Sequence, residues 1–544
     1  MMKKNKLLIL FIVLAMTFLL VSCDNTEPAP SATQKVDEAK TETKEEVKET
    51  APIEFEIAVR QEAGQPEWDE LSFYVKYNEN FPEYVISFNE IPDATATETL
   101  NLMLASGETL PDAFIDLPIT AYDVATYGTM GIFVPLDDYI NADIMPNLTD
   151  VYNQRPNYKS LVTVADGHIY SCPWIEEMGI THVRTILNVN QTWLDALGID
   201  APKTTQEFEE MLMMFKTEDL NGNGDASDEI PFSFVYANQG WDRAMGINYM
   251  FGAFGMPDNI DHTAVIDDKV VFTAGTEEFK NAVKWFNSLY EQGLIDQESF
   301  SQDSAQLAAK GKTEFTTIGC FPAWRDFQVL GAERAEEYSP MYPLIGPDGD
   351  QLWGRESNYS EMSKYKFVMS NDCENPAELM KWVDGLYDPL VSIENNWGTF
   401  DVVMKQTEEG LWYKALDEVP EGLTSGEWTK VNTARGPIAI LGDYFGTLTK
   451  MEQGGAQRLE IVKEYYNPYL LDQFLPDVNY SVEDTERLNT LKNDIIPYVD
   501  ETVARWITSG GIDEEWDDYL LMLQKAGVEE WIEIQQKGYE AFIN

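Results

Sequence analysis

Oxygen-bearing side chains alternate with small residues from Asp219 to Glu229, a spacing suited to metal binding. Side-chain oxygens stand at the first, third and fifth positions of this stretch, and Gly224 at the sixth position allows a sharp turn. Ca²⁺ prefers six to eight oxygen ligands, and alternating Asp and Asn residues on a tight loop can surround it. We therefore expect a structural calcium site. An Asn-Gly turn without metal is the alternative, because the same residues also favour positive φ.

The N-terminus carries a pattern for export and acylation. Lys3, Lys4 and Lys6 precede the apolar run from Leu7 to Val21, which is too short for an ordinary membrane-spanning helix and typical of a secretory signal. The run ends Leu-Val-Ser-Cys23, which resembles a bacterial lipobox. The resemblance implies that residues 1–22 form a signal peptide that is removed, and that Cys23 is acylated, with palmitate as one such group. The alternative is a signal peptide or anchor whose Cys is incidental.

The charge of the chain excludes some partners. The 544 residues include 38 basic and 94 acidic side chains, for a formal net charge of −56. Loss of residues 1–22, which carry three Lys and no acid, would leave 35 basic residues and a side-chain charge of −59. Such a charge repels phosphate, so we expect no nucleic-acid partner. Residues 23–544 contain no run of eighteen apolar residues, so lipid on Cys23 is the expected membrane attachment.

Three further cysteines lack the spacing of a metal site or a disulfide framework. Cys172, Cys320 and Cys373 are far apart in the chain, and no CxxC pair occurs. We expect buried free thiols, with one disulfide as the alternative in an extracytoplasmic setting.

Strand and helix patterns must position these groups. Residues 53–59 and 83–89 alternate as strands, residues 95–105 carry one apolar helical face, and residues 111–117 resume a strand. This order predicts a right-handed parallel α/β unit. Helix signals continue with a capping box at Thr204 and Glu207 and an N1 proline at Pro376. Residues 23–52 are mostly Glu, Lys, Thr, Ala, Pro and Ser, and they are expected to form a disordered acidic tether.

Six segments carry a resemblance to a known family. They are residues 105–112 (ASGETLPD), 131–140 (GIFVPLDDYI), 166–170 (DGHIY), 193–204 (WLDALGIDAPKT), 289–298 (LYEQGLIDQE) and the C-terminal stretch 516–539. In this order they resemble the large extracellular solute-binding proteins of bacterial ABC importers. More narrowly, they resemble the Gram-positive lipoproteins that deliver oligosaccharides, close to the alginate-binding type.

The resemblance implies an α/β fold of two lobes with a ligand cleft between them and several hinge crossings. The expected lobes are residues 53–165 plus 310–370 and residues 166–309 plus 371–544. The implied protein is no enzyme. It is a lipid-anchored monomer on the extracellular face of the cell membrane, which closes on a carbohydrate and delivers it to a membrane permease. The absence of a GxxxxGK[ST] sequence agrees with an ATPase on another chain.

The same resemblance implies a ligand set for the metal loop. The family pattern is Asp-x-Asn-Gly-Asn-Gly-x-x-Asp-Glu-Ile-Pro, and this chain has one more residue before its Asp-Glu pair. The implied calcium ligands are Asp219, Asn221, Asn223, Asp225, Asp228 and Glu229. The stretch departs from an EF-hand, because its twelfth position is Ile230 and an extended segment follows instead of a helix.

A carbohydrate cleft needs indole rings to stack on sugar C–H faces and polar groups to pair with sugar hydroxyls. Aromatic residues in loop-like stretches are therefore candidates, since such loops carry cleft residues. Arg60 joins them because it ends the first strand, and the carboxyl ends of parallel strands face the ligand crevice. The candidates are Trp174, Trp241, Trp324, Arg325, Trp353, Trp397 and Arg60. Core packing is the alternative for any single Trp.

Two other classes of function stay open at this point. A surface glycoside hydrolase needs only two carboxylates, which 94 acidic residues supply easily, although no nucleophile elbow or HExxH motif occurs. A peptide-binding or adhesive surface lipoprotein is the third possibility. Binding of a glycan without turnover distinguishes the first reading from the other two.

Overall fold

The computed structural model describes residues 51–236 and 240–544, except for the side chains of residues 240, 241 and 243. The expected signal peptide, Cys23 and the tether up to residue 50 lie outside the described residues. Residues Pro52–Asn544 form one unit. Within the described residues, no helix combines the length and the apolar character needed to cross a membrane.

The first sheet has six strands in the order β14-β4-β11-β3-β1-β2. They are β1 (Ile53–Gln61), β2 (Tyr84–Pro92), β3 (Ala113–Ile115), β4 (Ser171–Glu176), β11 (Met362–Met369) and β14 (Ile438–Ile440). β1 is parallel to β2 and β3, β14 is parallel to β4, and β11 is antiparallel to β3 and β4. With α1 (Ser72–Asn78) and α2 (Ala96–Ser106) between the first three strands, the expected parallel α/β unit is confirmed.

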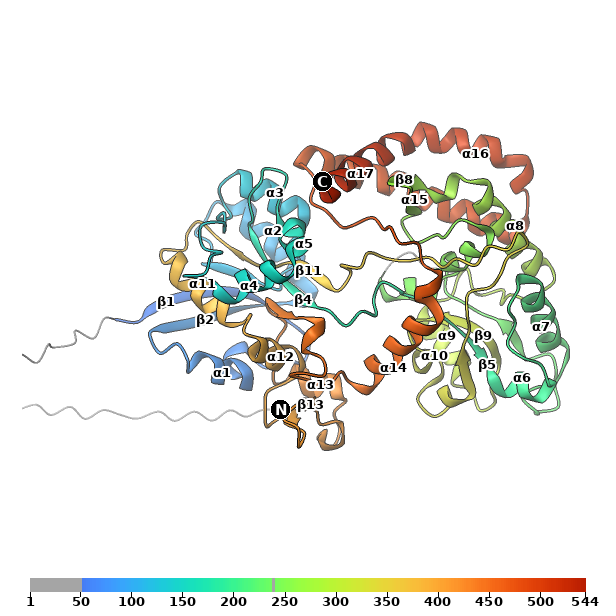
Figure 1. The fold of residues 1–544 in the computed structure, drawn as a ribbon, viewed down its shortest axis with the longest axis horizontal. Helices are drawn as coiled ribbons and strands as arrows, with labels where there is room; N and C mark the ends of the chain where they lie inside the picture. Colours follow the sequence, from blue (N-terminus) through green and yellow to red (C-terminus); the bar gives the residue numbers. More distant parts are fainter. Residues whose placement is uncertain (1–50, 237–239) are drawn as a thin grey trace, which may run out of the picture. The chain divides into compact units, whose positions relative to one another are not determined.

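Helices cover both faces of this sheet, because successive side chains of a strand point to opposite faces and both sets are apolar here. Ala58 and Phe114 pack with α2 and α3 (Ala121–Thr129). Ile57 and Ile115 pack on the other face, against α1 and three more helices. Those helices are α4 (Pro146–Gln154), α5 (Pro156–Val162) and α11 (Pro376–Gly385). In Figure 1, α2 and α3 lie above the strands of this sheet and α1 lies below them.

The second sheet has four strands in the order β10-β5-β9-β6. They are β5 (Ile186–Asn190), β6 (Ile230–Phe232), β9 (Ile318–Ala323) and β10 (Tyr338–Pro340). Its helices are α6 (Gln191–Leu197), α7 (Thr205–Thr217), α8 (Glu277–Glu291), α9 (Ser304–Gly311), α10 (Asp326–Leu330), α15 (Val482–Ser509), α16 (Ile512–Ala526) and α17 (Val528–Ile543). The expected capping box at Thr204 and Glu207 is confirmed at the start of α7.

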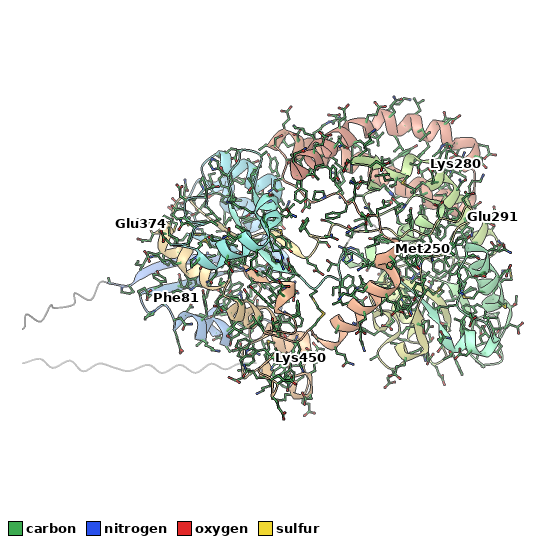
Figure 2. The ribbon with its side chains drawn as sticks, viewed as in Figure 1. Phe81, Met250, Lys280, Glu291, Glu374 and Lys450 are labelled. Atoms are coloured by element: carbon green, nitrogen blue, oxygen red, sulfur yellow. The ribbon has the colours of Figure 1, made fainter. Side chains whose placement is uncertain are left out.

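One large core joins these helices to the second sheet, and it includes residues of α7, α8, α15, α16 and α17. Met250 is buried in this core, whereas Glu291 at the end of α8 is exposed (Figure 2). The remaining elements are β7 (Thr263–Ile266), β8 (Lys269–Phe272), α12 (Pro389–Trp397), β12 (Met404–Gln406), β13 (Trp412–Lys414), α13 (Ser425–Lys430) and α14 (Gln453–Ile461).

The chain passes between the two sheets at residues 177–185 and 341–361, and it leaves the first sheet again after β14. The strands therefore divide differently from the expected lobe bounds. β4 and β14 belong to the first sheet, although residues 166–309 and 371–544 were assigned to the second lobe. β9 belongs to the second sheet, although residues 310–370 were assigned to the first. The physical reason is long-range pairing: β4 takes both β11 and β14 as neighbours.

Two buried charged side chains satisfy the backbone of the first crossing, residues 177–185. The Glu361 carboxylate accepts hydrogen bonds from the amides of Gly179, Ile180 and Thr181 at 2.7, 2.8 and 3.1 Å. The Arg458 guanidinium on α14 donates to the carbonyls of Val183, Arg184 and Trp324. Burial raises the pKa of Glu361 and lowers that of Arg458 to about 9.

The expectation of free thiols is confirmed. Cys172, Cys320 and Cys373 are unpaired, and the first two are buried.

Candidate functional site

The carboxyl ends of the parallel strands in the first sheet lie along one edge. β1 reaches Arg60, Asp116 follows β3, and β4 ends at Glu176. β14 is in register with β4, with Ile440 opposite Glu176. Ligands of open α/β sheets bind outside such ends. In the second sheet, the end of β9 lies close to the first crossing. The Arg458 guanidinium donates both to the carbonyl of Trp324, directly after β9, and to the carbonyls of residues 183 and 184.

Trp174 and Trp397 are brought together at this edge. Both belong to one apolar cluster formed by β4, α12 and β14. The indole Nε1 of Trp174 donates to Oδ1 of Asn396 at 3.2 Å, and Nδ2 of Asn396 donates to Oε1 of Glu176 at 2.9 Å. Trp174 is half-buried and Trp397 is 8% exposed. The half-exposed indole of Trp174 is thus linked through one amide to a carboxylate.

A second pair of aromatic rings packs on the same cluster. Phe400 and Trp412 stack with ring centroids 3.6 Å apart and planes 4° from parallel. Both are half-buried, and Lys414 follows Trp412 by two residues. Sequence reasoning missed this pair. Phe400 carried a usable signal, since it follows Trp397 and Gly398, whereas Trp412 follows two Glu residues and a Gly that suggested only a solvated loop.

The environment of Glu176 changes its protonation. Burial, and next the nearby carboxylate of Glu361, raise the pKa of Glu176 to about 7, although Asn396 donates a hydrogen bond to it. Its carboxyl group is therefore close to half-protonated at neutral pH. Such a group can both donate to and accept from a hydroxyl group of a neutral ligand.

Trp324 and Arg325 lie together after β9, and α14 holds both. The Arg458 guanidinium carbon lies 3.4 Å from the centre of the Trp324 ring, which is a cation–π contact. Arg325 donates through Nη1 to the carbonyl of Gly454 at 2.5 Å. A Cβ at Gly455 would come within 2.6 Å of Cε of Met178, which packs on the cluster of Trp174. Helix α14 therefore lies between the candidate residues after β9 of the second sheet and those beside β4 of the first sheet.

Arg60 is engaged by acids rather than free for a ligand. Its Nε and Nη2 donate to Asp116 at 3.0 and 2.6 Å, and Nη1 donates to Asp93 at 3.1 Å. Lys366 forms a further ion pair with Asp116. The pKa of Arg60 is raised: burial lowers it, and the two carboxylates more than compensate. Arg60 positions the loop ends at this edge of the sheet.

Two predicted residues lie elsewhere. The prediction for Trp353 was wrong, because its side chain is 1% exposed and packs within the core of the second sheet, 5.0 Å from the ring of Tyr466. The segment around it has no regular structure, as expected, but it is buried at Trp353. Trp241 belongs to a short 3-10 helix, Gly240–Met245, but its side chain is not among those that the structure describes.

The loop between α7 and β6 is closed by its own polar groups. Asp219 accepts from the amides of Gly222 and Gly224, both at 2.9 Å. The side-chain amides of Asn221 and Asn223 both donate to Asp228, at 2.9 and 2.7 Å. Gly224 has φ 93°, as a sharp turn at the sixth position requires.

The last residues of the loop complete its polar ring. Asp225 accepts from the amide and hydroxyl of Ser227 at 3.1 and 2.6 Å. Glu229 is 7% exposed and accepts through Oε1 from the amides of Leu220 and Asn221. Its Oε2 is buried and has no partner within the described residues. An acidic oxygen of this kind suits a cation, and the donor set of carboxylate and amide oxygens suits Ca²⁺.

Across the described residues, no three His, Cys, Asp or Glu side chains gather closely enough to hold a metal. That description counts no Asn, and two of the six implied calcium ligands are Asn. The carboxylates of the loop accept hydrogen bonds from amides instead.

Comparison with known proteins gives one family. Residues 73–384 match the model of the family described as bacterial extracellular solute-binding protein. The chain is 37% identical over 455 residues to the fructooligosaccharide ABC transporter substrate-binding protein FusA of Streptococcus pneumoniae, and the match covers 82% of each chain. It is 24% identical to lipoprotein LipO of Bacillus subtilis, over 60% of this chain and 62% of that one.

Solved structures agree on the fold. FusA in complex with kestose superposes with a TM-score of 0.77 at 33% identity, covering 90% of this chain and 99% of that one. An EF-hand mutant of FusA in complex with fructo-nystose gives the same figures. An ABC-transporter-associated solute-binding protein from Bifidobacterium longum infantis, named as HMO binding, gives a TM-score of 0.78 at 23% identity, over 91% of this chain and 99% of that one. This last likeness shows the fold alone.

The raised pKa of Glu176 predicts a pH dependence of stability. A folded-state pKa above the unfolded value stabilises the fold at low pH, and this stability is lost as pH rises through the folded pKa. Between about pH 4.5 and about pH 7, the unfolding free energy of the wild type should fall relative to Glu176→Gln by roughly 2–3 kcal/mol. Urea unfolding at several pH values measures this, with Glu98→Gln, an exposed acid on α2, as control. Parallel curves for wild type and Glu176→Gln would contradict it.

Proposed function

The chain belongs to the family of bacterial extracellular solute-binding proteins, and on this basis we propose that it captures an oligosaccharide of the fructooligosaccharide class for an ABC importer. In this function it delivers the sugar to a membrane permease. Its relatives are substrate-binding proteins, so its role is binding rather than catalysis. The observation that carries the proposal is the linked set Trp174, Asn396 and Glu176 beside the Phe400–Trp412 stack at the strand ends.

The chemistry of this set suits a neutral sugar. A half-exposed indole offers a flat apolar surface for the C–H face of a ring, and its N–H is already fixed by Asn396. The carboxyl group of Glu176 pairs with sugar hydroxyls. Trp324 supplies a second indole from the other sheet, held by Arg458. The ligand is then gripped from both sheets, which is the arrangement that couples capture to lobe closure.

The lobes themselves follow the two sheets in this proposal. The first lobe comprises residues 53–176 plus 362–440, and the second comprises residues 186–340 plus the C-terminal helices. The segments between them form the hinge. This division replaces the bounds expected from the sequence, since it keeps every strand with its partners.

Replacing the indoles tests the site. Trp174→Ala and Trp324→Ala should each weaken binding of kestose by about tenfold or more, because loss of about 1.4 kcal/mol of contact energy is tenfold in Kd. Titration calorimetry of the mature protein against fructo-, galacto- and gluco-oligosaccharides and peptides measures affinity, and product analysis checks for turnover. The control is Trp382→Phe, a core residue of α11.

Three outcomes would overturn the proposal. If the control weakens binding as much as the two site variants, the site is misplaced. If peptides bind and no oligosaccharide does, the ligand class is wrong. Release of new reducing ends would make the protein a hydrolase.

The lipid anchor is part of the same proposal. The Leu-Val-Ser-Cys23 pattern supports removal of residues 1–22 and acylation of Cys23, and the relative LipO is named a lipoprotein. The acidic tether then holds the binding unit away from the membrane on its extracellular face.

Cys23→Ser should release the protein from the membrane fraction into the medium of a Gram-positive host. Incorporation of a clickable palmitate analogue should be lost at the same time. A Cys172→Ser variant controls for labelling of other thiols, since Cys172 is a buried thiol. A Cys23→Ser protein that stays with the membrane would contradict the anchor.

We also propose that the loop at residues 219–229 binds structural calcium. The donor set, the sharp turn at Gly224 and the buried unpartnered oxygen of Glu229 support it, and an EF-hand was mutated in the structural relative FusA. Asp219, Asn221, Asn223, Asp225, Asp228 and Glu229 would hold the ion. Bound calcium would neutralise part of the loop's negative charge and tie α7 to β6.

Asp219→Ala should lower the melting temperature by several degrees in calcium, because binding to the folded state alone stabilises it. In chelator, wild type and Asp219→Ala should melt close together. Differential scanning fluorimetry with and without calcium measures this, and Asp200→Ala, an exposed acid after α6, is the control. An equal loss with chelator present would mean that Asp219 acts through its turn hydrogen bonds and not through a metal.

A further inference from the structure

A lysine stands beside the proposed sugar site. Lys414 is the last residue of β13, two positions after Trp412, so the two side chains lie on the same face of that strand. The ring of Trp412 packs on the apolar cluster that also includes Trp174. The ammonium group of Lys414 therefore belongs to the face of β13 that carries the rings of the site.

Lys414 differs from the other lysines of the described residues. It is half-buried, and its ammonium group forms neither a hydrogen bond nor an ion pair with any described residue. Partial burial lowers the pKa of Lys414, although the carboxylates of Glu452 and Glu176 raise it. Every other described lysine without such a partner is exposed, namely Lys159, Lys203, Lys269, Lys312, Lys450, Lys463 and Lys525.

The second carboxylate oxygen of Glu176 is free as well. Oε1 of Glu176 accepts from Asn396, whereas no described residue donates to Oε2. Neither this oxygen nor Nζ of Lys414 is among the buried polar atoms that lack a partner, so both atoms are open to solvent. The two charges act on each other but form no ion pair. A ligand can thus reach both atoms and lie between them.

The other charges near this pair favour a neutral ligand. Glu452 precedes α14 and acts on Lys414 more strongly than Glu176 does. Arg435, an exposed residue shortly before β14, is the basic group that acts on Glu176. A ligand carboxylate at Lys414 would approach the carboxylates of both Glu176 and Glu452, which repel it. A neutral polar group meets no such repulsion.

A hydroxyl group matches the space between an ammonium and a carboxylate. Its oxygen accepts a hydrogen bond from the ammonium, and its hydrogen is donated to the carboxylate. Both hydrogen bonds are charge-assisted and therefore stronger than those between neutral groups. The rings of Trp174 and Trp412 lie in the same cluster and offer apolar surface to the C–H face of a sugar. A hydroxyl of a ring-shaped sugar thus suits this arrangement.

We propose that Lys414 determines the specificity of the sugar site by donating a hydrogen bond to one ligand hydroxyl, which in turn donates to Glu176. This role rests on the oligosaccharide function proposed above and deepens it, because the site then selects sugars that present a hydroxyl at this point. A site built to hydrogen-bond a hydroxyl rejects the analogue that lacks it, since its own polar groups are left without partners.

The test changes the ligand and the protein together. The ligands are kestose, the set of kestoses that each lack one hydroxyl, and trigalacturonate as an acidic sugar. Lys414→Met keeps the apolar stem of the side chain and removes its charge. Lys450→Met is the matched control: Lys450 (Figure 2) is exposed, and its amide donates to the carbonyl of Trp412 at 2.8 Å. Titration calorimetry gives Kd, and the melting temperature without ligand reports on folding.

We expect Lys414→Met to weaken kestose binding about tenfold or more, and Lys450→Met to leave it unchanged. One deoxygenated kestose should bind the wild type about tenfold or more weakly than kestose does. The same analogue should lose several-fold less in Lys414→Met, because the hydroxyl there has already lost its ammonium partner. Without ligand, Lys414→Met should melt at or above the wild-type temperature, since burial of Lys414 disfavours its charged form.

Four results would overturn this role of Lys414. In the first, Lys414→Met binds kestose as the wild type does. In the second, every deoxygenated kestose loses the same factor against both proteins. In the third, Lys414→Met melts several degrees below the wild type without ligand, which would make its effect on binding structural. In the fourth, trigalacturonate binds more tightly than kestose, so that Lys414 pairs with a ligand carboxylate. Failure of kestose and every other glycan to bind the wild type would instead overturn the proposed function.

Discussion

Residues 177–185 must leave a sheet and cross to another one while their backbone polar groups stay paired. A strand would pair them with a neighbouring strand, but a crossing segment has none. Here one carboxylate and one guanidinium do this work. Glu361 accepts from three successive amides, and Arg458 takes two carbonyls further along. The two charges are buried, so their pKa values move in the directions that desolvation dictates, and neither can be removed without leaving several backbone groups unpaired.

The same two side chains reach into the proposed sugar site. Arg458 lies against the ring of Trp324, and Glu361 contributes to the raised pKa of Glu176. The side chains proposed to recognise the ligand are thus in direct contact or electrostatic range of the two that pair the backbone of the crossing. Replacing Glu361 or Arg458 would therefore alter the proposed sugar site, although neither side chain is proposed to touch the ligand. The linked set Trp174, Asn396 and Glu176 depends in turn on β4 and α12 being adjacent, which the pairing of β14 with β4 ensures.

Local features were predictable from the sequence and distant pairings were not. The first three strands and their helices have clear periodicity, and the capping box at Thr204 acts within one turn, so both were confirmed. The strands divide differently from the expected lobe bounds because β11 and β14 pair with β4 from about 190 and 265 residues further along the chain, and no local pattern records this pairing. Trp174 and Trp397, both candidates from loop-like stretches, meet in one apolar cluster, and their contact with a ligand stays a prediction. Trp353 was misjudged because an irregular, loop-like segment can still be buried in a core, and the local sequence does not record this. Phe400 and Trp412 meet only through the pairing of β12 with β13.

The contact between Arg458 and Trp324 has a consequence for the fluorescence of this indole. The emission wavelength of an indole depends on the electric field across its ring, and the Arg458 guanidinium 3.4 Å from the ring centre of Trp324 contributes to that field. Arg458 belongs to α14, which follows the last strand of the first sheet, whereas Trp324 follows β9 of the second. A shift of Arg458 relative to Trp324 therefore changes the field across the indole ring. The emission of this indole is thus tied to the position of α14, the helix whose Arg458 also binds the carbonyls of the first crossing.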